Sequence, residues 1–275
     1  MTSRTPSHTA APVALDGTLD GALDALAATP VLLVALDFDG TLAPTVDDPD
    51  AARAIPEARA AVVALAGLPA TRVAVVSGRA LASLERVAQL PSDVLLVGSH
   101  GAEFRIDGEE SGPELSDDER ELLGHLYLAV SDVAARFEGV MVEEKPAGCG
   151  LHTRLASTED TARARSAALA AVAELGQGRI SERYGKDILE FTIRRADKGS
   201  AIEVLRERTG ATATLFIGDD VTDEDAFVRL GAGDVGVKVG EGATAAEYRV
   251  EDPESVARLL TAFAHSRERS GPPRR

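Results

Sequence analysis

Cysteine is almost absent from this sequence, since Cys149 is the only one among 275 residues. One cysteine excludes an internal disulfide and a zinc site built from several thiolates. No run approaches the roughly 18 uninterrupted apolar residues that a transmembrane helix needs. Near the N-terminus, Asp16, Asp20 and Asp24 interrupt any apolar core, so we expect no signal peptide. These absences predict a cytoplasmic protein, because disulfides are rare in reducing compartments.

Positive charge is also scarce, with 29 Lys and Arg against 45 Asp and Glu and a net charge of −16. This excess of negative charge repels phosphates at long range, so we expect neither nucleic acid nor a membrane surface as a partner. An anionic small molecule would need local positive charge from a metal ion or a lysine. The sequence also lacks a Walker A loop and a GxSxG turn, which disfavours a P-loop NTPase and a serine hydrolase.

What the sequence does have is an apolar run followed at once by two acids. Residues 31–36, VLLVAL, predict a buried parallel strand, and residues 37–41, DFDGT, follow it. Open α/β sheets bind their ligands at the carboxyl ends of their strands. Close carboxylates such as Asp37 and Asp39 repel each other, so one is protonated or a cation lies between them. Taken alone, the segment is more often a turn than a catalytic site, since Asp and Gly are common turn residues.

Strands and helices alternate on both sides of a central region. Further apolar strands separated by helices are predicted at 72–76, 94–97, 214–217 and 235–239, which is typical of a parallel sheet. Between them, two helices and two strand pairs predict an inserted α+β domain. The fold class is therefore α/β, a Rossmann-like parallel sheet with an α+β cap. The predicted parts are a partly disordered N-terminal segment at 1–29, a core at 30–107 and 195–265, a cap at 108–194 and a flexible basic tail at 266–275.

Unusual polar residues follow several of the core strands. They are Asp37, Asp39, Ser77, Arg79, His100, Asp219, Asp220 and Asp223, and Lys198 opens a helix. Each has a plain alternative, since Ser and Asp cap helices and most lysines are solvated. Together they supply the parts of phosphoryl transfer. Mg²⁺ prefers carboxylate oxygens, Ser77, Thr41 and Lys198 can donate to a phosphate, and one carboxylate can attack phosphorus while another transfers protons.

Four of these segments resemble the motifs of the haloacid-dehalogenase-like phosphatases. They are DFDGT, SGR, Lys198-Gly199 and GDDVTDED, in this order along the chain. The resemblance implies that Asp37 is the nucleophile and a Mg²⁺ ligand, and that Asp39 is the general acid and base and binds the metal through its carbonyl. It further implies that Ser77 and Lys198 hold the phosphoryl group, with Gly78 and Arg79 beside it. The implied metal ligands from the last motif are Asp219, Asp220 and Asp223.

The predicted cap is similar to that of the trehalose-6-phosphate phosphatases. The shared features are His100-Gly-Ala-Glu, Glu143-x-Lys145, His152-x-Arg154, and Gly185-Lys186 followed by Glu190. The resemblance implies that Glu143, Lys145 and Glu190 bind hydroxyls of the distal glucose, with His100, Arg154 and Lys186 nearby and His152 unassigned. The family's usual HYR reads HTR here, so the ring contact has no counterpart at Thr153. From spacing alone, a half-exposed sheet with cross-strand ion pairs is the favoured interpretation of these residues, and the resemblance reverses that preference.

These features predict a Mg²⁺-dependent phosphatase that hydrolyses trehalose 6-phosphate through an aspartyl-phosphate. One alternative is a related phosphatase for another sugar phosphate, of the sucrose or glucosylglycerate type. A second is a catalytically silent regulatory subunit that binds the sugar phosphate or a synthase partner. A third is a receiver-like protein that is phosphorylated on Asp37 without turnover. Intact carboxylates at Asp37 and Asp39 argue against the last two.

Overall fold

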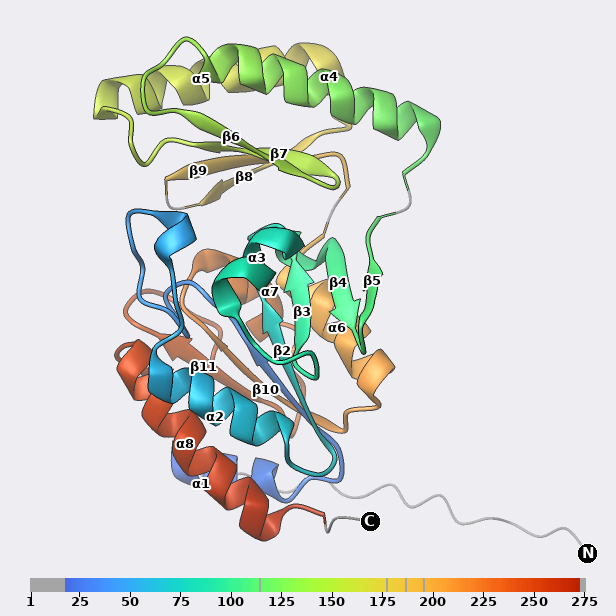
Figure 1. Ribbon diagram of the computed structural model, residues 1–275, viewed down its shortest axis with the longest axis vertical. Coiled ribbons are helices and arrows are strands. Elements are labelled where there is room, and N and C mark those ends of the chain that lie inside the picture. Colours follow the sequence, from blue (N-terminus) through green and yellow to red (C-terminus); the bar gives the residue numbers. More distant parts are fainter. Residues whose placement is uncertain (1–17, 114, 177, 186, 195, 273–275) are drawn as a thin grey trace, which may run out of the picture.

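A computed structural model describes residues 18–113, 115–176, 178–185, 187–194 and 196–272. Its two parts are a larger core and a smaller cap that lies over one edge of the core (Figure 1). The prediction of a partly disordered N-terminal segment falls mainly on residues 1–17, which lie outside the described residues. The described part of that segment contains helix α1, Leu19–Ala27.

The core is built on one sheet of eight strands within the described residues. The strands β1, β2, β3, β10, β11 and β12 run parallel, β4 is antiparallel to its neighbour β3, and β5 is antiparallel to β4. Across the sheet the order is β12 (Tyr248–Val250), β11 (Val235–Val239), β10 (Ala213–Gly218), β1 (Leu32–Leu36), β2 (Thr71–Val76), β3 (Leu95–Gly98), β4 (Glu103–Ile106) and β5 (Glu109–Ser111). Strand β1 is central and fully buried because helices cover both faces.

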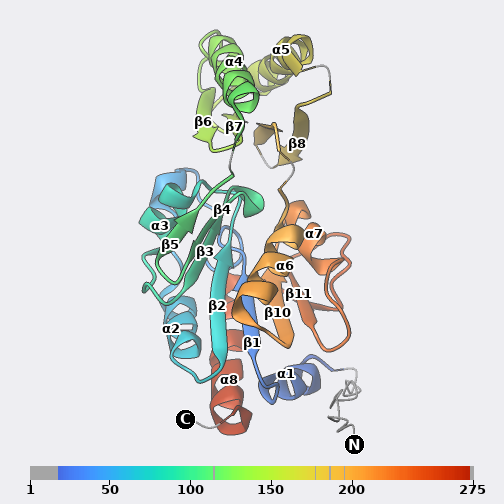
Figure 2. The same ribbon diagram turned by 90° about the vertical axis from the view of Figure 1, so that its right-hand side faces the viewer.

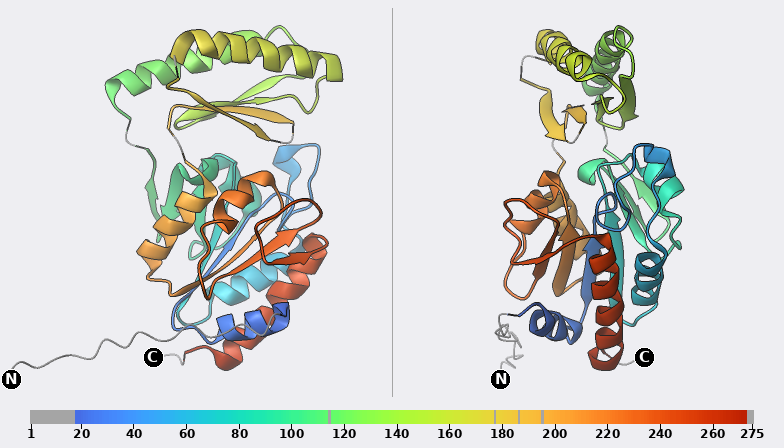
Figure 3. Two further views of the ribbon diagram at one scale, coloured as in Figure 1. Left: turned by 180° about the vertical axis from the view of Figure 1, so that it is seen from behind. Right: turned by 90° about the vertical axis from the view of Figure 1, so that its left-hand side faces the viewer.

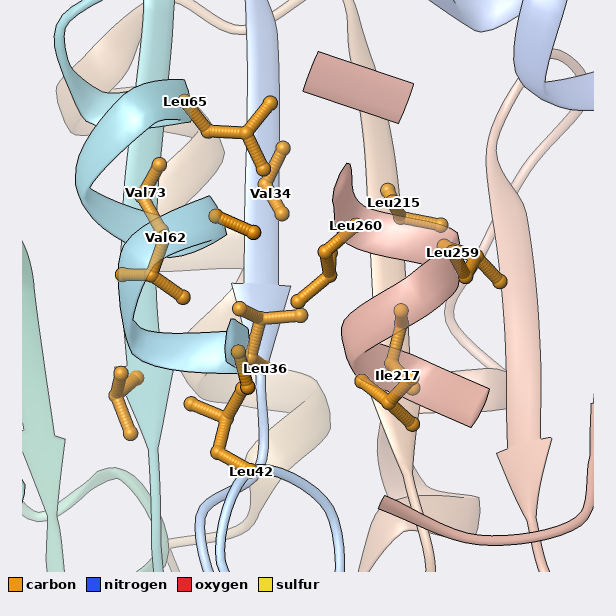
Figure 4. Close-up of a cluster of buried hydrophobic side chains, with 14 of the residues drawn as sticks. Val34, Leu36, Leu42, Val62, Leu65, Val73, Leu215, Ile217, Leu259 and Leu260 are labelled. Atoms are coloured by element: carbon orange, nitrogen blue, oxygen red, sulfur yellow. The ribbon is translucent and has the colours of Figure 1, made fainter. Parts of the chain in front are cut away.

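Helices cover the two faces of this sheet (Figure 2). On one face lie α1, α2 (Pro56–Ala66), α3 (Leu81–Ala88) and α8 (Pro253–Ser270), and on the other α6 (Lys198–Thr209) and α7 (Glu224–Phe227). Apolar side chains of β1 and β10, such as Leu36 and Ile217, lie beside Val62 of α2 and Leu260 of α8 (Figure 4). The short 3₁₀ helices are η1 (Pro49–Ala51), η2 (Ser99–Gly101) and η3 (Val221–Asp223).

The cap is a four-stranded antiparallel sheet with two helices on one face. Its strand order is β6 (Met141–Lys145), β7 (Gly148–His152), β9 (Ile188–Thr192) and β8 (Ser181–Gly185). The helices α4 (Asp117–Ala134) and α5 (Thr158–Gly176) pack on the face that carries Cys149, Leu151 and Phe191. The opposite face of this sheet is turned toward the core (Figure 3). The predicted α/β core with an α+β cap is therefore confirmed.

The structure differs from the sequence prediction at two boundaries. Strand β5 belongs to the core sheet, so the core extends past residue 108, where the cap was predicted to begin. Helix α8 continues to Ser270, so residues 266–270 of the predicted flexible tail are helical. Arg267 is 2% exposed and donates to the carbonyls of Ala27, Thr29 and Ala70 at 2.9, 2.5 and 2.8 Å. The guanidinium of Arg267 thus anchors the end of α8. The basic composition of the tail did not indicate these contacts. None of the described helices is both long and apolar enough to cross a bilayer.

Candidate active site

The predicted polar segments meet at the edge of the core sheet that faces the cap (Figure 1). Strands β1 and β10 run parallel with Leu36 opposite Ile217, so Asp37 and Asp219 follow the ends of neighbouring strands. Strands β2 and β3 lie on the other side of β1, and their ends carry Ser77 and His100. This juxtaposition follows from the parallel arrangement, because every parallel strand ends at the same edge.

An acidic cluster lies at the centre of this edge. Carboxylate oxygens of Asp37, Asp219 and Asp223 all lie within 4.8 Å of one another. The ammonium of Lys198 donates to Asp37 Oδ1 at 2.6 Å and to Asp223 Oδ1 at 2.7 Å. Lys198 is 2% exposed and Asp223 is fully buried. Lys198, at the first position of α6, therefore holds two of the three carboxylates together.

Two glycines make room for this cluster. Gly40 has a φ of +88°, and a Cβ there would lie 2.1 Å from Asp219 Oδ2. A Cβ on Gly218 would lie 2.2 Å from the carboxyl carbon of Asp223. Any other residue at either position would displace a carboxylate, so the glycines of DFDGT and GDD are required by the cluster itself.

The electrostatics of the cluster favour an added cation. Burial raises the pKa of Asp37 well above its ordinary value, Lys198 opposes that shift, and Asp223 and Asp219 add to it. Burial and the neighbouring Asp223 raise the pKa of Asp219 to about 6. Burial would lower the pKa of Lys198, but Asp223 and Asp37 outweigh it and the pKa rises. Three carboxylates thus share one lysine, and their hard oxygen donors fit a divalent cation that would offset the remaining negative charge.

Two predicted metal residues lie outside this cluster. The carboxylate of Asp220 caps the short helix η3, and the Asp220 N–H donates to Asp223 Oδ2 at 2.9 Å. The carboxylate of Asp39 forms a two-point ion pair with Arg79, with Nε–Oδ2 at 2.5 Å and Nη2–Oδ1 at 2.7 Å. The role of Asp220 at the metal stays a prediction: its carboxylate is not in the group that lies within 4.8 Å, and its N–H binds one member of that group.

Arg79 contacts more than Asp39. Its guanidinium also lies over the ring of Phe38, with the carbon 5.9 Å from the ring centroid. The Arg79 N–H donates to Ser77 Oγ at 3.2 Å. Ser77 is 2% exposed, and on the neighbouring loop Thr41 Oγ1 donates to Asp219 Oδ1 at 3.4 Å. The two predicted phosphate-binding hydroxyls thus lie on buried loops beside the acidic cluster.

The cap contacts the loop after β2 directly. Lys145 Nζ donates to the carbonyl oxygen of Gly78 at 2.8 Å and to Glu190 Oε1. Glu190 Oε2 lies 2.8 Å from His100 Nε2, on the core. Burial would raise the pKa of Glu190, but Lys145 and His100 outweigh it and the pKa is lowered. Four predicted substrate residues, Gly78, His100, Lys145 and Glu190, therefore form one network across the domain interface.

Glu143 makes a second contact between cap and core. It accepts from the Ala80 N–H at 3.4 Å through Oε1, and its Oε2 lies 3.1 Å from His152 Nε2. In the cap sheet, Glu143 and Glu190 are both opposite Gly150, so they project from the same face on either side of it. Burial would raise the pKa of Glu143, yet the hydrogen bond from His152 and the charge of Lys145 lower it. His152, which the sequence left unassigned, thus orients Glu143.

The remaining predicted cap residues are less closely tied to this network. Arg154 donates to the Val46 carbonyl on the loop after DFDGT, and its Nε lies 3.7 Å from Asp187 Oδ2. Lys186 lies outside the described residues. Thr153, at the position of the family's tyrosine, is 3% exposed and donates to the Asp187 carbonyl at 3.3 Å, so it is turned into the cap.

Sequence reasoning missed one residue of this site, Lys238. It is 4% exposed and its ammonium donates to the carbonyl oxygen of Asp219 at 2.5 Å. The available signal was a lysine inside the apolar strand VGVKV, where a charge needs a partner.

Comparisons with known proteins find matches over most of the chain. The sequence profile of the trehalose-phosphatase family matches residues 35–254. A trehalose-phosphate phosphatase of Mycobacterium avium is 33% identical over 253 residues, which cover 86% of this chain and 63% of that protein. The chain thus spans less than two thirds of this relative's length.

Solved structures show the same fold. A trehalose-6-phosphate phosphatase related protein matches with a TM-score of 0.71 and 27% identity, covering 85% of this chain and 97% of its own. The C-terminal domain of the trehalose-6-phosphate phosphatase of C. albicans matches with a TM-score of 0.76 and 22% identity. The match covers 94% of this chain and 99% of that one. The second likeness bears on the fold alone.

Proposed function

The chain belongs to the trehalose-phosphatase family, and from this premise we propose that it hydrolyses trehalose 6-phosphate to trehalose and phosphate. The observation that carries the proposal is the position of the cap residues Glu143, Lys145 and Glu190 directly over the loop beside the Asp37 cluster. A sugar bound to the cap would present its phosphate to a buried carboxylate. Serine and lysine donors lie on the same edge.

In the proposed reaction, Asp37 is the nucleophile. A carboxylate oxygen of Asp37 attacks phosphorus, the bond to the sugar oxygen breaks, and Asp39 gives that oxygen its proton. Asp39 then takes a proton from water, which attacks the aspartyl-phosphate, releases phosphate and regenerates Asp37. Lys198, Ser77 and Thr41 donate to the phosphoryl oxygens as negative charge grows on them. Arg79, through its two-point contact, keeps Asp39 in a fixed orientation.

Mg²⁺ is the proposed cofactor, held by Asp37, Asp219 and Asp223 together with the carbonyl of Asp39. When bound, it supplies positive charge that offsets the negative charge of the phosphoryl oxygens and the excess negative charge of the acidic cluster. Asp220 supports the site through its cap on η3 and its N–H contact with Asp223.

The acidic cluster predicts a pH-dependent effect of Mg²⁺ on stability. Burial and the charge of Asp223 raise the pKa of Asp219 from its ordinary value of 3.8 to about 6 in the folded protein. Because the folded protein binds the Asp219 proton more tightly than the unfolded chain does, protonation of Asp219 stabilises the metal-free fold. This stabilisation is fully present below about pH 3.8 and is lost as the pH rises through 6. Above pH 6 the bare carboxylate favours a cation instead. We therefore expect Mg²⁺ to raise the Tm of EDTA-treated protein more at pH 7.5 than at pH 5.

Thermal unfolding with and without Mg²⁺ at both pH values measures this effect. Asp219→Asn is the control, because it removes the titrating group and should shrink the Mg²⁺ shift at pH 7.5. Equal Mg²⁺ shifts at the two pH values in the unsubstituted protein would contradict the role of Asp219.

The cap residues are proposed to choose the sugar. Sugar hydroxyls both donate and accept, so Glu143, Lys145 and Glu190 can each bond one. In the described structure these side chains bond core groups and one another. A bound sugar would replace some of these partners, with Arg154, His100 and Lys186 nearby, and the closed cap would exclude water from the phosphoryl site.

Glu143→Ala is expected to lower kcat/KM for trehalose 6-phosphate and to spare p-nitrophenyl phosphate. Losing a hydrogen bond to a charged group costs about 1.5–3 kcal/mol, or roughly 10–100-fold. The small substrate has no second sugar for Glu143 to bind. Glu144→Ala is the matched control, since Glu144 is the exposed next residue on the same strand. An equal loss on both substrates would remove Glu143 from the specificity role.

Phosphate release with Mg²⁺ from trehalose 6-phosphate, sucrose 6-phosphate, glucose 6-phosphate and p-nitrophenyl phosphate tests the whole proposal. Preference for another sugar phosphate would keep the Asp37 chemistry and overturn the assignment of the cap. No release from a folded protein would favour the regulatory subunit, and a long-lived phosphoprotein after acetyl phosphate would favour the receiver. Association with a trehalose-phosphate synthase and a cytoplasmic location stay predictions.

A further inference from the structure

Lys238 is a buried charge in a strand that otherwise has only apolar residues and glycine. Its neighbours Val237 and Val239 join the apolar cluster on one face of the core sheet, whereas Lys238 itself points away from them. Lysine is almost never buried this deeply unless it is paired. The strand register places Lys238 opposite Gly218, the last residue of β10, so the ammonium lies where the acidic loop begins.

The partners of Lys238 are mainly backbone oxygens of that loop. Its Nζ donates to the carbonyl of Asp219 at 2.5 Å and to the carbonyl of Asp220 at 3.3 Å. A third partner is Glu224 Oε1, at 3.6 Å. The other oxygen of Glu224 accepts from the Ala245 N–H at 2.8 Å. The ammonium is therefore satisfied by the loop and by the helix that follows it.

These contacts fix one peptide unit from both sides. The carbonyl of Asp219 is held by Lys238, and the N–H of Asp220, in the same peptide, is held by Asp223 Oδ2 at 2.9 Å. Because a peptide unit is planar, holding both its polar groups sets its orientation and with it the direction of the Asp219 side chain. The other oxygen of Asp223 is held by Lys198. Two buried lysines thus brace the acidic cluster, one through its carboxylates and one through its backbone.

We propose that Lys238 is a positioning residue that holds the Asp219–Asp220 peptide so that Asp219 can share a divalent cation with Asp37 and Asp223. The inference rests on the proposed metal site. The proposal predicts the direction in which the loss of Lys238 changes the affinity for a cation. If Lys238 acted only as a nearby positive charge, removing it would strengthen cation binding, because like charges repel. If Lys238 positions the loop, removing it weakens cation binding.

The test is calorimetric titration of Mg²⁺ into substrate-free, metal-stripped protein. Removing groups that orient metal ligands typically costs about 10–100-fold in affinity, so Lys238→Met should raise the Kd for Mg²⁺ by about that factor. Lys238→Gln keeps a donor without the charge and should fall between Met and the unsubstituted protein. Arg267→Met is the matched control, a buried cation that donates to the backbone carbonyls of Ala27, Thr29 and Ala70 and not to the acidic loop. It should leave the Kd for Mg²⁺ unchanged.

The possible outcomes separate the role of Lys238 from the existence of the metal site. A Kd for Mg²⁺ that is unchanged or tighter in folded Lys238→Met and Lys238→Gln would overturn the proposal, and so would a fall in Tm with no change in Kd. Should the Met variant fail to fold, the Gln variant alone decides by the same criterion. Failure of the unsubstituted protein to bind Mg²⁺ would instead overturn the metal site. Because no sugar phosphate is present, the result does not depend on which substrate the enzyme uses.

Discussion

Asp37→Asn is expected to abolish phosphate release and to leave the fold intact. An amide is a poor nucleophile, and losing even a positioned acid or base costs roughly 10²–10⁴-fold in rate, so losing the nucleophile should cost at least as much. Stability should not fall, because burial opposes a charge at this position and the amide carries none. The amide oxygen can still accept from Lys198. Phosphate release and Tm, measured on the same preparation, separate the two effects.

Asp50→Asn is the matched control for this variant. Asp50 is exposed, and its ion pair with Arg86 lies outside the acidic cluster. The same change of charge there should leave the rate as it is. A loss of about a hundredfold is the low end of the expected effect. If Asp37→Asn keeps more than about a hundredth of the activity, Asp37 is not the nucleophile.

Lys198→Met is expected to have the largest effect on stability. Its ammonium is the charged partner of both Asp37 and Asp223, at 2.6 and 2.7 Å, and all three side chains are buried. Removing one partner from a buried ion pair costs about 3–5 kcal/mol, because the charge left behind has no counterion. Urea unfolding in EDTA should show this loss in the free energy of unfolding. Phosphate release should also fall, since Lys198 is a proposed donor to the phosphoryl group.

The double variant Lys198→Met with Asp223→Asn tests the cause of that loss. Removing one of the two unpaired carboxylates should restore part of the stability, so the two changes should not be additive. Mg²⁺ should also stabilise Lys198→Met, since a cation can replace the missing charge. Equal urea midpoints for Lys198→Met and the unsubstituted protein would show that the ammonium is not the counterion of the cluster.

The acidic cluster was predictable because it depends on a rule about sheets. Parallel strands end at one edge, so acids that directly follow two such strands must be neighbours once the strands are identified. The apolar runs before Asp37 and Asp219 identified the strands. Lys198 was found through its motif, and the structure places it between Asp37 and Asp223.

The errors and omissions share a different origin. The basic tail looked flexible, yet Arg267 finds three carbonyls on distant segments. Lys238 looked like one residue of a short strand, although its partners lie some twenty positions earlier in the chain. In each case the partner, and not the residue type, decides the role.

The α/β core, the inserted cap and the carboxylates at the strand ends could be predicted from the sequence, because periodicity and strand direction are local properties of the chain. The contacts within the site could not. They are the bonds of Lys198 to Asp37 and Asp223, of Arg79 to Asp39, of Lys145 and Glu190 to the core, and of Lys238 to the acidic loop. These are contacts between segments far apart in the chain. A hydrogen bond depends on a few tenths of an ångström, which only the packed arrangement of the segments sets.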